Sequence, residues 1–307
     1  MVFLYYIFAT LLPVDKIIGK VYPLFAIALL FMAVGILVML FVHHPTLPEL
    51  TDGLTNTHPS GLPIFPIMFV SIACGAISGF HATQSPLMAR CMPNERYARP
   101  VFYGAMITEG IVALVWAAAA TYFYQEQGMS ESNAAVIVDA ITKEWLGVVG
   151  GLLAVLGVIA APITSGDTAF RSARLIVADF LHVEQHSIVK RLLICVPMFI
   201  VAIGILLYSQ QDAACFDMIW RYFAWTNQTL AVFTLWALTV YLAQVRKNYW
   251  IPLLPALFMS AVCSTYILVA PEGLHLPTWP AQIAGIVIAV CLAIAFFLWR
   301  RKMLKEE

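Results

Sequence analysis

Two polar stretches interrupt apolar runs of this chain, and the first of them, residues 75–86, carries the residue types of a binding site. It holds two glycines, a histidine, three hydroxyls and an amide. An unpaired backbone N–H or C=O costs several kcal/mol in hydrocarbon, so polar broken backbone is tolerated at membrane depth only where protein buries it or it lines a watery cavity. The residues that we assign to a predicted substrate site are Ser78, Gly79, His81, Thr83, Gln84 and Ser85, with Asn227 from a later apolar run.

His81 is the residue that gives this stretch its chemistry, because a histidine donates hydrogen bonds to an anion or carries a proton near neutral pH. The break would also free the N-terminus of a half-helix, whose backbone N–H groups and dipole favour a carboxylate. The alternative is a buried histidine that a neighbouring helix satisfies, with Ser85 and Pro86 ending the span. Asn227 and the adjacent Gln228 are more often hydrogen-bonding groups between helices than ligands, and that alternative stays open for Asn227.

The second polar stretch, residues 161–168, crowds oxygen atoms into one turn after Pro162. Hard oxygen atoms together with a carboxylate suit a sodium ion or a proton, and paired interruptions of this kind point to the binding site of a transporter. The residues that we assign to ion coupling here are Thr164, Ser165, Asp167 and Thr168. The same stretch also suits a helix start, in which Ser165 or Asp167 caps the next segment and Asp167 pairs with Arg171. The two interpretations do not exclude each other.

Glu109 is an acidic residue well inside the apolar run 101–122. Burial of an ionised carboxylate is expensive unless the charge is paired, so we expect Glu109 to bind a proton and to take part in ion coupling. The alternative is a neutral carboxyl group that is hydrogen-bonded within the bundle, or that pairs with a residue such as His81.

The composition places these polar residues in a membrane protein, since 62% of the residues are hydrophobic and only 11% are charged. A compact soluble domain does not have such a composition. The lipid bilayer is therefore an expected partner, whereas the net charge of zero argues against nucleic acid. The six cysteines show no C-x-x-C spacing, so we expect neither a disulfide framework nor a metal site, and no cofactor.

Hydropathy predicts an all-α, polytopic fold with about eight full crossings and a partial segment at the N-terminus. Each crossing has roughly the 20 residues that a helix needs to span the hydrocarbon. The predicted crossings are residues 21–42, 64–85, 101–122, 145–164, 189–208, 219–243, 250–270 and 281–299. Residues 1–12 are apolar but too short to cross, and they read as the tail of a helix whose beginning is absent.

Basic residues fix the expected orientation, because Lys and Arg collect in cytoplasmic loops. Of the 17 basic residues, all but Lys143 and Arg221 fall in alternate loops or in the C-terminal tail. These loops share one side of the predicted membrane, so we expect a cytoplasmic C-terminus.

The strings SGFHATQSPLMARC (78–91), NERYARPVFYGAM (94–106), APITSGDTAFRSARL (161–175) and RYFAWTNQTLA (221–231) resemble the carbon starvation protein A family of bacterial inner-membrane transporters. The resemblance implies uptake of peptides, or of pyruvate by proton symport, a role in carbon starvation, and relationship to transporters built on inverted repeats. It also implies a division into residues 1–125, the end of the family's N-terminal region, and residues 145–299, its C-terminal five-helix region. Residues 300–307 form a basic cytoplasmic tail. Family members have a further membrane portion upstream.

Three classes of function remain, and a secondary active transporter, or the C-terminal portion of one, is the leading one. An uncoupled channel or facilitator would share the broken helices but would need no titratable coupling residue, and a truncated fragment would not transport. An intramembrane enzyme is disfavoured, because the sequence has no H-E-x-x-H, no G-x-S-x-G and no phosphate loop. Peptide and pyruvate, and proton and sodium, stay open as alternatives.

The distribution of basic residues predicts that Arg96 and Lys305 face the cytoplasm and that Asn133 faces outside. Cysteines placed at these three positions test this with an impermeant thiol reagent on intact cells. We expect labelling at 133 alone, and labelling at 96 or 305 without labelling at 133 would reverse the topology.

Overall fold

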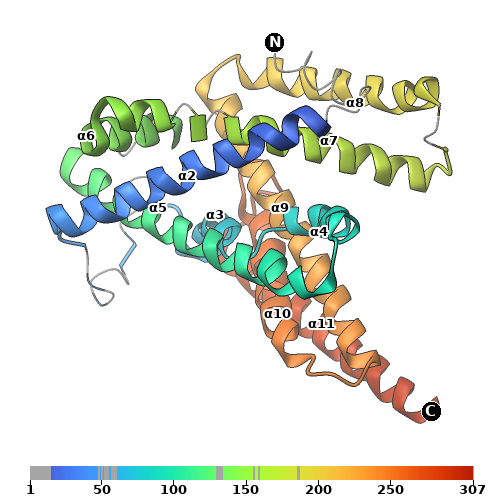
Figure 1. Cartoon of the computed structure of the whole chain (residues 1–307). Helices are drawn as coiled ribbons and strands as arrows, with labels where there is room; N and C mark the ends of the chain where they lie inside the picture. Colours follow the sequence, from blue (N-terminus) through green and yellow to red (C-terminus); the bar gives the residue numbers. More distant parts are fainter. Residues whose placement is uncertain are drawn as a thin grey trace. The chain divides into compact units, whose positions relative to one another are not determined.

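The computed structural model describes residues 15–47, 49, 51, 55–56, 61–128, 134–154, 156–157, 160–184 and 187–306. All regular structure in this part of the chain is helical, which confirms the predicted all-α class. The longer helices, drawn in Figure 1, are α2 (Asp15–His43), α4 (Phe80–Cys91), α5 (Ala105–Gln127), α6 (Ala134–Ala154), α7 (Ala160–Phe180), α8 (Ile188–Ser209), α9 (Ala213–Gln244), α10 (Trp250–Val269) and α11 (Thr278–Glu306). Short helical pieces precede α4: η2 (Ile64–Met68), α3 (Phe69–Ile72) and η3 (Ala73–Gly75). Two more, η4 (Glu95–Tyr97) and η5 (Arg99–Gly104), precede α5.

Six helical segments among the described residues are long and apolar enough to cross a membrane, and they establish a multi-pass protein. They are Pro23–His43, Ile64–Cys91, Glu95–Gln125, Ile188–Ser209, Trp250–Val269 and Thr278–Lys305. Each corresponds to one of the crossings expected from hydropathy, whereas the total of eight stays a prediction. The partial segment 1–12 lies outside the described residues.

The other two expected crossings behave differently from each other. Residues 145–164 run from α6, which ends at Ala154 and whose backbone is non-helical at Gly147, to α7, which begins at Ala160, and the residues between these helices are described only in part. Residues 219–243 form one unbroken part of α9.

The chain forms two compact units, each built from two separate stretches. Unit 1 comprises Met1–Thr55 and Arg99–Gly204, and unit 2 comprises Asn56–Ala98 and Ile205–Glu307. The division expected from the family resemblance, at 1–125, 145–299 and 300–307, concerns regions of the family and stays a prediction.

The core of unit 1 lies where α2, α5 and α6 meet. Phe123 is fully buried there, and its ring lies 5.3 Å from that of Trp145. His43 at the end of α2 stacks on the same tryptophan, with the ring centroids of His43 and Trp145 5.6 Å apart. Aromatic contacts of this kind stabilise a helix bundle beyond the area that they bury.

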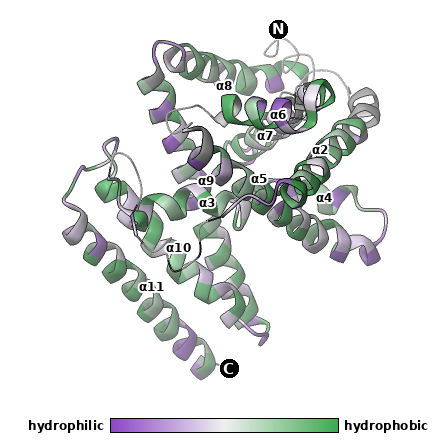
Figure 2. Ribbon diagram, turned by 90° about the vertical axis from the view of Figure 1, so that its left-hand side faces the viewer, coloured by the Kyte–Doolittle hydropathy of each residue, from purple (hydrophilic) through white to green (hydrophobic). Residues whose placement is uncertain are grey.

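Unit 2 is built around α10, the most buried of the six candidate spans, which packs against both α9 and α11. Two tryptophans of α9 tie it to α10: Trp225 donates to the carbonyl of Cys263 at 3.0 Å, and Trp236 donates to the hydroxyl of Ser260 at 3.0 Å. In Figure 2, α11 is hydrophobic over most of its length and hydrophilic towards the C-terminus. This packing fixes α9 beside the short helical pieces at residues 64–91.

Candidate functional site

The candidate site is the break in the candidate span Ile64–Cys91, between the end of η3 at Gly75 and the start of α4 at Phe80. The predicted interruption at this point is confirmed. The predicted end of the span at Pro86 is wrong, because α4 continues through this proline to Cys91. Pro86 is the seventh of the twelve residues of α4 and lies in its interior.

Asn227 of α9 supplies the cap that α4 lacks in its own sequence. The residue before α4, Gly79, has no side chain for capping, and the backbone N–H of Phe80 donates instead to Asn227 Oδ1 at 2.9 Å and to Ser78 Oγ at 3.3 Å. The Asn227 amide nitrogen in turn donates to Ser78 Oγ at 3.3 Å and lies 3.4 Å from the sulfur of Cys74. The first N–H of a helix has no intrahelical partner, so a capping oxygen from another helix does the work of a local Ser or Asp.

Gln228, the next residue of α9, joins the two sides of the break. In the amide orientation that its neighbours require, its oxygen accepts from the N–H of Cys74 at 3.0 Å and its nitrogen donates to the carbonyl of Ile77 at 2.7 Å. The side chain is completely buried. Asn227 and Gln228 therefore act as the hydrogen-bonding groups between helices that the sequence suggested, and both serve the broken backbone.

Gly79 allows α9 to come this close. A Cβ atom at this position would lie 2.0 Å from the carbonyl oxygen of Asn227 and 2.7 Å from the backbone nitrogen of Ala231. No side chain fits there unless α9 shifts, so the glycine is what lets the backbone of α9 approach.

The backbone donors that we expected to bind a carboxylate are occupied. Besides Phe80, the N–H of His81 donates to Ser78 O at 3.3 Å and the N–H of Ala82 donates to Gly79 O at 3.0 Å. The expectation of free N–H groups at this half-helix is therefore wrong for this structure, because Asn227 and the preceding turn satisfy them. The helix dipole remains, but an anion would need side-chain donors.

Gln84 of α4 offers such a donor, and His81 offers one through Nε2 when both nitrogens of its imidazole carry a proton. His81 is half-buried, and its Nδ1 lies 3.1 Å from the carbonyl oxygen of Ser78, so Nδ1 carries the proton. The amide nitrogen of Gln84 is buried, and no hydrogen-bond acceptor for it is found in the described part of the chain. The hydroxyls of Thr83 and Ser85 donate back to their own helix, to Phe80 O at 2.9 Å and His81 O at 2.7 Å.

The predicted ion-coupling residues all belong to unit 1. Glu109 lies at an exposed position of α5. Residues 164–168 have helical backbone within α7, which begins at Ala160. The side chains of Thr164, Ser165, Asp167 and Thr168 lie outside what the structure describes, and their roles stay predictions.

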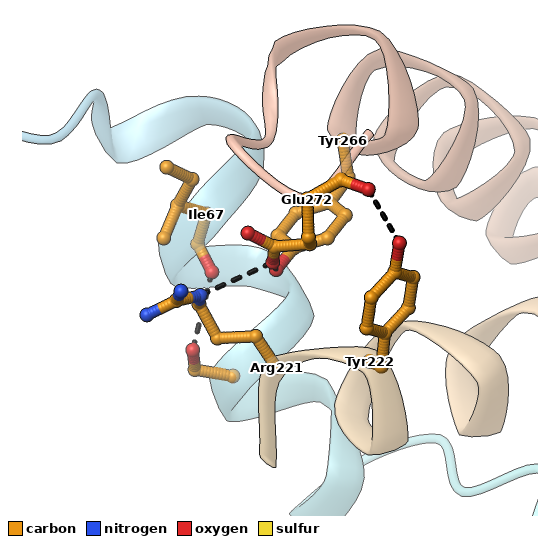
Figure 3. A network of polar contacts seen from close by, with 6 residues as sticks. Ile67, Arg221, Tyr222, Tyr266 and Glu272 are labelled. Atoms are coloured by element: carbon orange, nitrogen blue, oxygen red, sulfur yellow. Dashed lines mark hydrogen bonds and ion pairs between the residues drawn. The ribbon is translucent and has the colours of Figure 1, made fainter. Parts of the chain in front are cut away.

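A buried carboxylate that the sequence did not reveal lies in the connection between α10 and α11. The side chain of Glu272 is only 1% exposed, and its Oε1 accepts from Arg221 Nε at 3.1 Å and from the Tyr266 hydroxyl at 2.7 Å (Figure 3). The hydroxyl of Tyr222 donates to the backbone carbonyl of Glu272. The one sign in the sequence was Arg221 itself, which departs from the distribution of the other basic residues and so called for an acidic partner.

The six candidate spans and the broken helix make the chain a multi-pass membrane protein of the kind that includes transporters. A family model described as carbon starvation protein CstA matches residues 1–152 and 127–266. The chain belongs to this family, which confirms the resemblance seen in its sequence. No solved structure matches the chain.

The relatives that carry functional names are transporters. The chain is 36% identical to the pyruvate/proton symporter BtsT of Escherichia coli over 37% of its own length and 16% of that protein. It is 42% identical to the peptide transporter CstA of the same organism, over 27% of its length and 12% of the relative. An uncharacterised membrane protein of Haemophilus influenzae is 49% identical over 46% of the chain and 41% of that protein. The chain thus spans less than half of each of these relatives.

The capping contact predicts that Asn227→Ala destabilises unit 2. The change leaves the N–H of Phe80 with only its longer hydrogen bond to Ser78 Oγ, and loss of an N-terminal cap costs about 0.5–2 kcal/mol. The matched control is Thr234→Ala on the same helix, whose exposed hydroxyl bonds only to the carbonyl of Leu230. Thermal unfolding of the purified proteins in detergent should show a clear loss for Asn227→Ala alone, and equal losses would contradict the capping role.

Proposed function

We propose that this chain is a secondary active transporter, or the C-terminal portion of one, for peptides or small carboxylates such as pyruvate. It acts in the inner membrane of a bacterium during carbon starvation, with its C-terminus in the cytoplasm. The observation that carries the proposal is the broken helix between Gly75 and Phe80, a feature that membrane proteins retain where a binding site needs it. The names of BtsT and CstA support this class of substrate.

The chemistry of the break favours a carboxylate, which peptides and pyruvate share. With the backbone donors of α4 occupied, the imidazole of His81 and the amide nitrogen of Gln84 are the groups that bind it in this proposal. Binding of a carboxylate would stabilise the Gln84 nitrogen most. A buried donor without an acceptor is costly, and an anionic acceptor forms a strong hydrogen bond with it. Ser78, Gly79 and Asn227 hold the break in shape around the site, while Thr83 and Ser85 line the same turns of α4.

A proton is the coupling ion in this proposal, and a sodium ion is the alternative. Glu109 binds the proton, and the oxygen atoms of residues 164–168 are the second candidate for the ion. The name of the pyruvate/proton symporter BtsT supports a proton.

A further membrane portion upstream completes the cavity in this proposal, since the chain spans only part of the relatives that it matches. A channel or facilitator would share the broken helix but would carry substrate without a gradient. Catalysis has no part in the proposal, and the relatives with functional names are named as transporters.

Uptake into proteoliposomes tests the proposal. Labelled pyruvate and a labelled dipeptide are supplied with and without a proton gradient, to this chain and to a version joined to the upstream region of a longer relative. We expect accumulation that depends on the gradient, and Glu109→Gln should abolish this dependence while equilibrium binding survives, because an amide cannot exchange a proton. Flux that ignores the gradient would indicate a facilitator, and gradient-driven uptake by Glu109→Gln would remove Glu109 from the mechanism, with Asp167→Asn the next variant.

The proposed substrate site predicts that Gln84→Met weakens substrate binding without lowering the stability of the protein. The change removes a donor that a substrate carboxylate needs, so the Kd should rise roughly ten- to a hundredfold, which corresponds to about 1–3 kcal/mol. The unliganded protein should not lose stability, because the amide has no acceptor to give up. His81→Ala should weaken binding by a similar factor.

The control is Ser71→Ala in the same span, an exposed hydroxyl that bonds only to the carbonyl of Ile67. Lower melting temperatures for Gln84→Met and His81→Ala together with wild-type affinity would mean that both side chains only join helices.

A further inference from the structure

One end of unit 2 carries a concentration of positive charge, which we call the basic end. Its members come from the connection between α9 and α10 and from the last turns of α11: Arg246, Lys247, Arg300, Arg301, Lys302 and Lys305. Over residues 244–250 and 299–307 these six basic residues are accompanied by two acidic ones, Glu306 and Glu307. Figure 2 shows the same end of α11 as hydrophilic. The basic end therefore has a net positive charge.

Side-chain contacts hold the two contributing segments together. The guanidinium of Arg300 donates through Nη1 to the hydroxyl of Tyr249 at 2.7 Å, and its Cζ lies 4.5 Å from the centroid of the same ring. The ring centroid of Tyr249 lies 5.6 Å from that of Phe296 on α11. Phe296 is buried in an apolar cluster with Ala243 of α9 and Leu253 of α10. The end of α9, the start of α10 and the end of α11 are thus packed at the same end of the unit.

The helix dipoles explain only a small part of this charge. Each helix C-terminus is equivalent to roughly half a negative charge and each N-terminus to roughly half a positive charge. Helices α9 and α11 end here while α10 begins here, so the three dipoles together amount to about half a negative charge. The excess of four basic over acidic residues in the two segments is much larger than that. Most of the positive charge of the basic end therefore calls for an anionic partner.

Aromatic residues indicate the depth at which the basic end lies in the membrane. Trp250, at the start of the candidate span Trp250–Val269, is 48% exposed, and Trp299 directly precedes Arg300 near the end of the candidate span Thr278–Lys305. Trp and Tyr gather where the hydrocarbon meets the polar headgroups. The basic residues next to these aromatic side chains consequently lie at the level of the lipid phosphates.

We propose that the basic end of unit 2 binds the phosphate group of an anionic phospholipid, a role that goes beyond the proposed function. Arg300 is the central residue, because a guanidinium has five N–H donors arranged to match phosphate oxygens and the bond to Tyr249 uses one of them. Lys247 from the connection, and Arg301 and Lys305 from α11, are exposed and attract the same anion. A headgroup bound between these residues joins the α9–α10 connection to the end of α11.

Binding of a short-chain phosphatidylglycerol to the purified full chain in a nonionic detergent, measured by native mass spectrometry, tests the site. The wild type should bind it more tightly than phosphatidylcholine, and the affinity should fall as salt is added, since salt screens exposed charges. Lys247→Gln should raise the Kd about fivefold, the equivalent of about 1 kcal/mol for one basic residue near a charged membrane surface. Arg301→Gln combined with Lys305→Gln should raise the Kd about fivefold for each charge removed.

The matched control is Arg90→Gln combined with Arg96→Gln, which removes two positive charges from exposed positions of unit 2 outside the basic end. This variant should keep the wild-type Kd. An equal loss of affinity in this control and in the Arg301 and Lys305 variant would mean that binding follows net charge alone, and the site would be overturned.

The remaining outcomes separate a lipid site from its alternatives. Phosphatidylglycerol should raise the melting temperature of the wild type more than that of the Arg301 and Lys305 variant, because a ligand stabilises the folded state that binds it. A lower melting temperature of the lipid-free variant with wild-type affinity would mean that these residues only stabilise the helix ends. Glycerol phosphate that binds as tightly as phosphatidylglycerol would indicate a site for free phosphate compounds, and equal affinity for phosphatidylcholine would exclude recognition of charge. Each of these three results overturns the proposal. If the double variant does not fold, Lys247→Gln decides, and a wild-type Kd in that variant overturns the site.

Discussion

The broken backbone between Gly75 and Phe80 is the constraint on which unit 2 depends, because hydrocarbon offers no water to satisfy the freed groups. The adjacent side-chain amides of Asn227 and Gln228 on α9 form hydrogen bonds with the freed backbone groups of the break. Gly79 is part of the same arrangement, since any side chain there would push α9 away. α9 in turn is held by α10 through Trp225 and Trp236, so the core of unit 2 fixes the geometry of the break.

Most buried polar groups of a folded protein have a hydrogen-bond partner, so a buried group without one marks a position where a bound ligand would be stabilising. Two such exceptions in unit 2 are the amide nitrogen of Gln84 and the second carboxyl oxygen of Glu272. They differ in kind, because the first lacks an acceptor and the second lacks a donor. An anionic substrate would supply the acceptor that Gln84 lacks, as the proposed function requires.

Sequence reasoning found the break and its amides because each conflicts with an apolar surrounding, and such a conflict must be resolved by a specific contact. It missed the Glu272 site because the residue stands in a short connection that reads as exposed, and its partner Arg221 lies 51 positions away. Burial there depends on the connection folding back onto α10, where Leu274 N–H bonds to Ile267 O at 3.0 Å and Leu276 N–H bonds to Leu268 O at 2.7 Å. A hydropathy profile does not show that this connection folds back onto α10.

The two exceptions are linked by one helix. Arg221 and Asn227 are six residues apart on α9, about 9 Å along the axis of a regular helix. A helix moves as a rigid element along its axis. The backbone of α9 at Asn227 packs directly against Gly79, so a movement of α9 also moves the break. A shift of α9 that begins at the ion pair between Arg221 and Glu272 would therefore alter the capping of α4 at Phe80 and with it the position of His81 and Gln84.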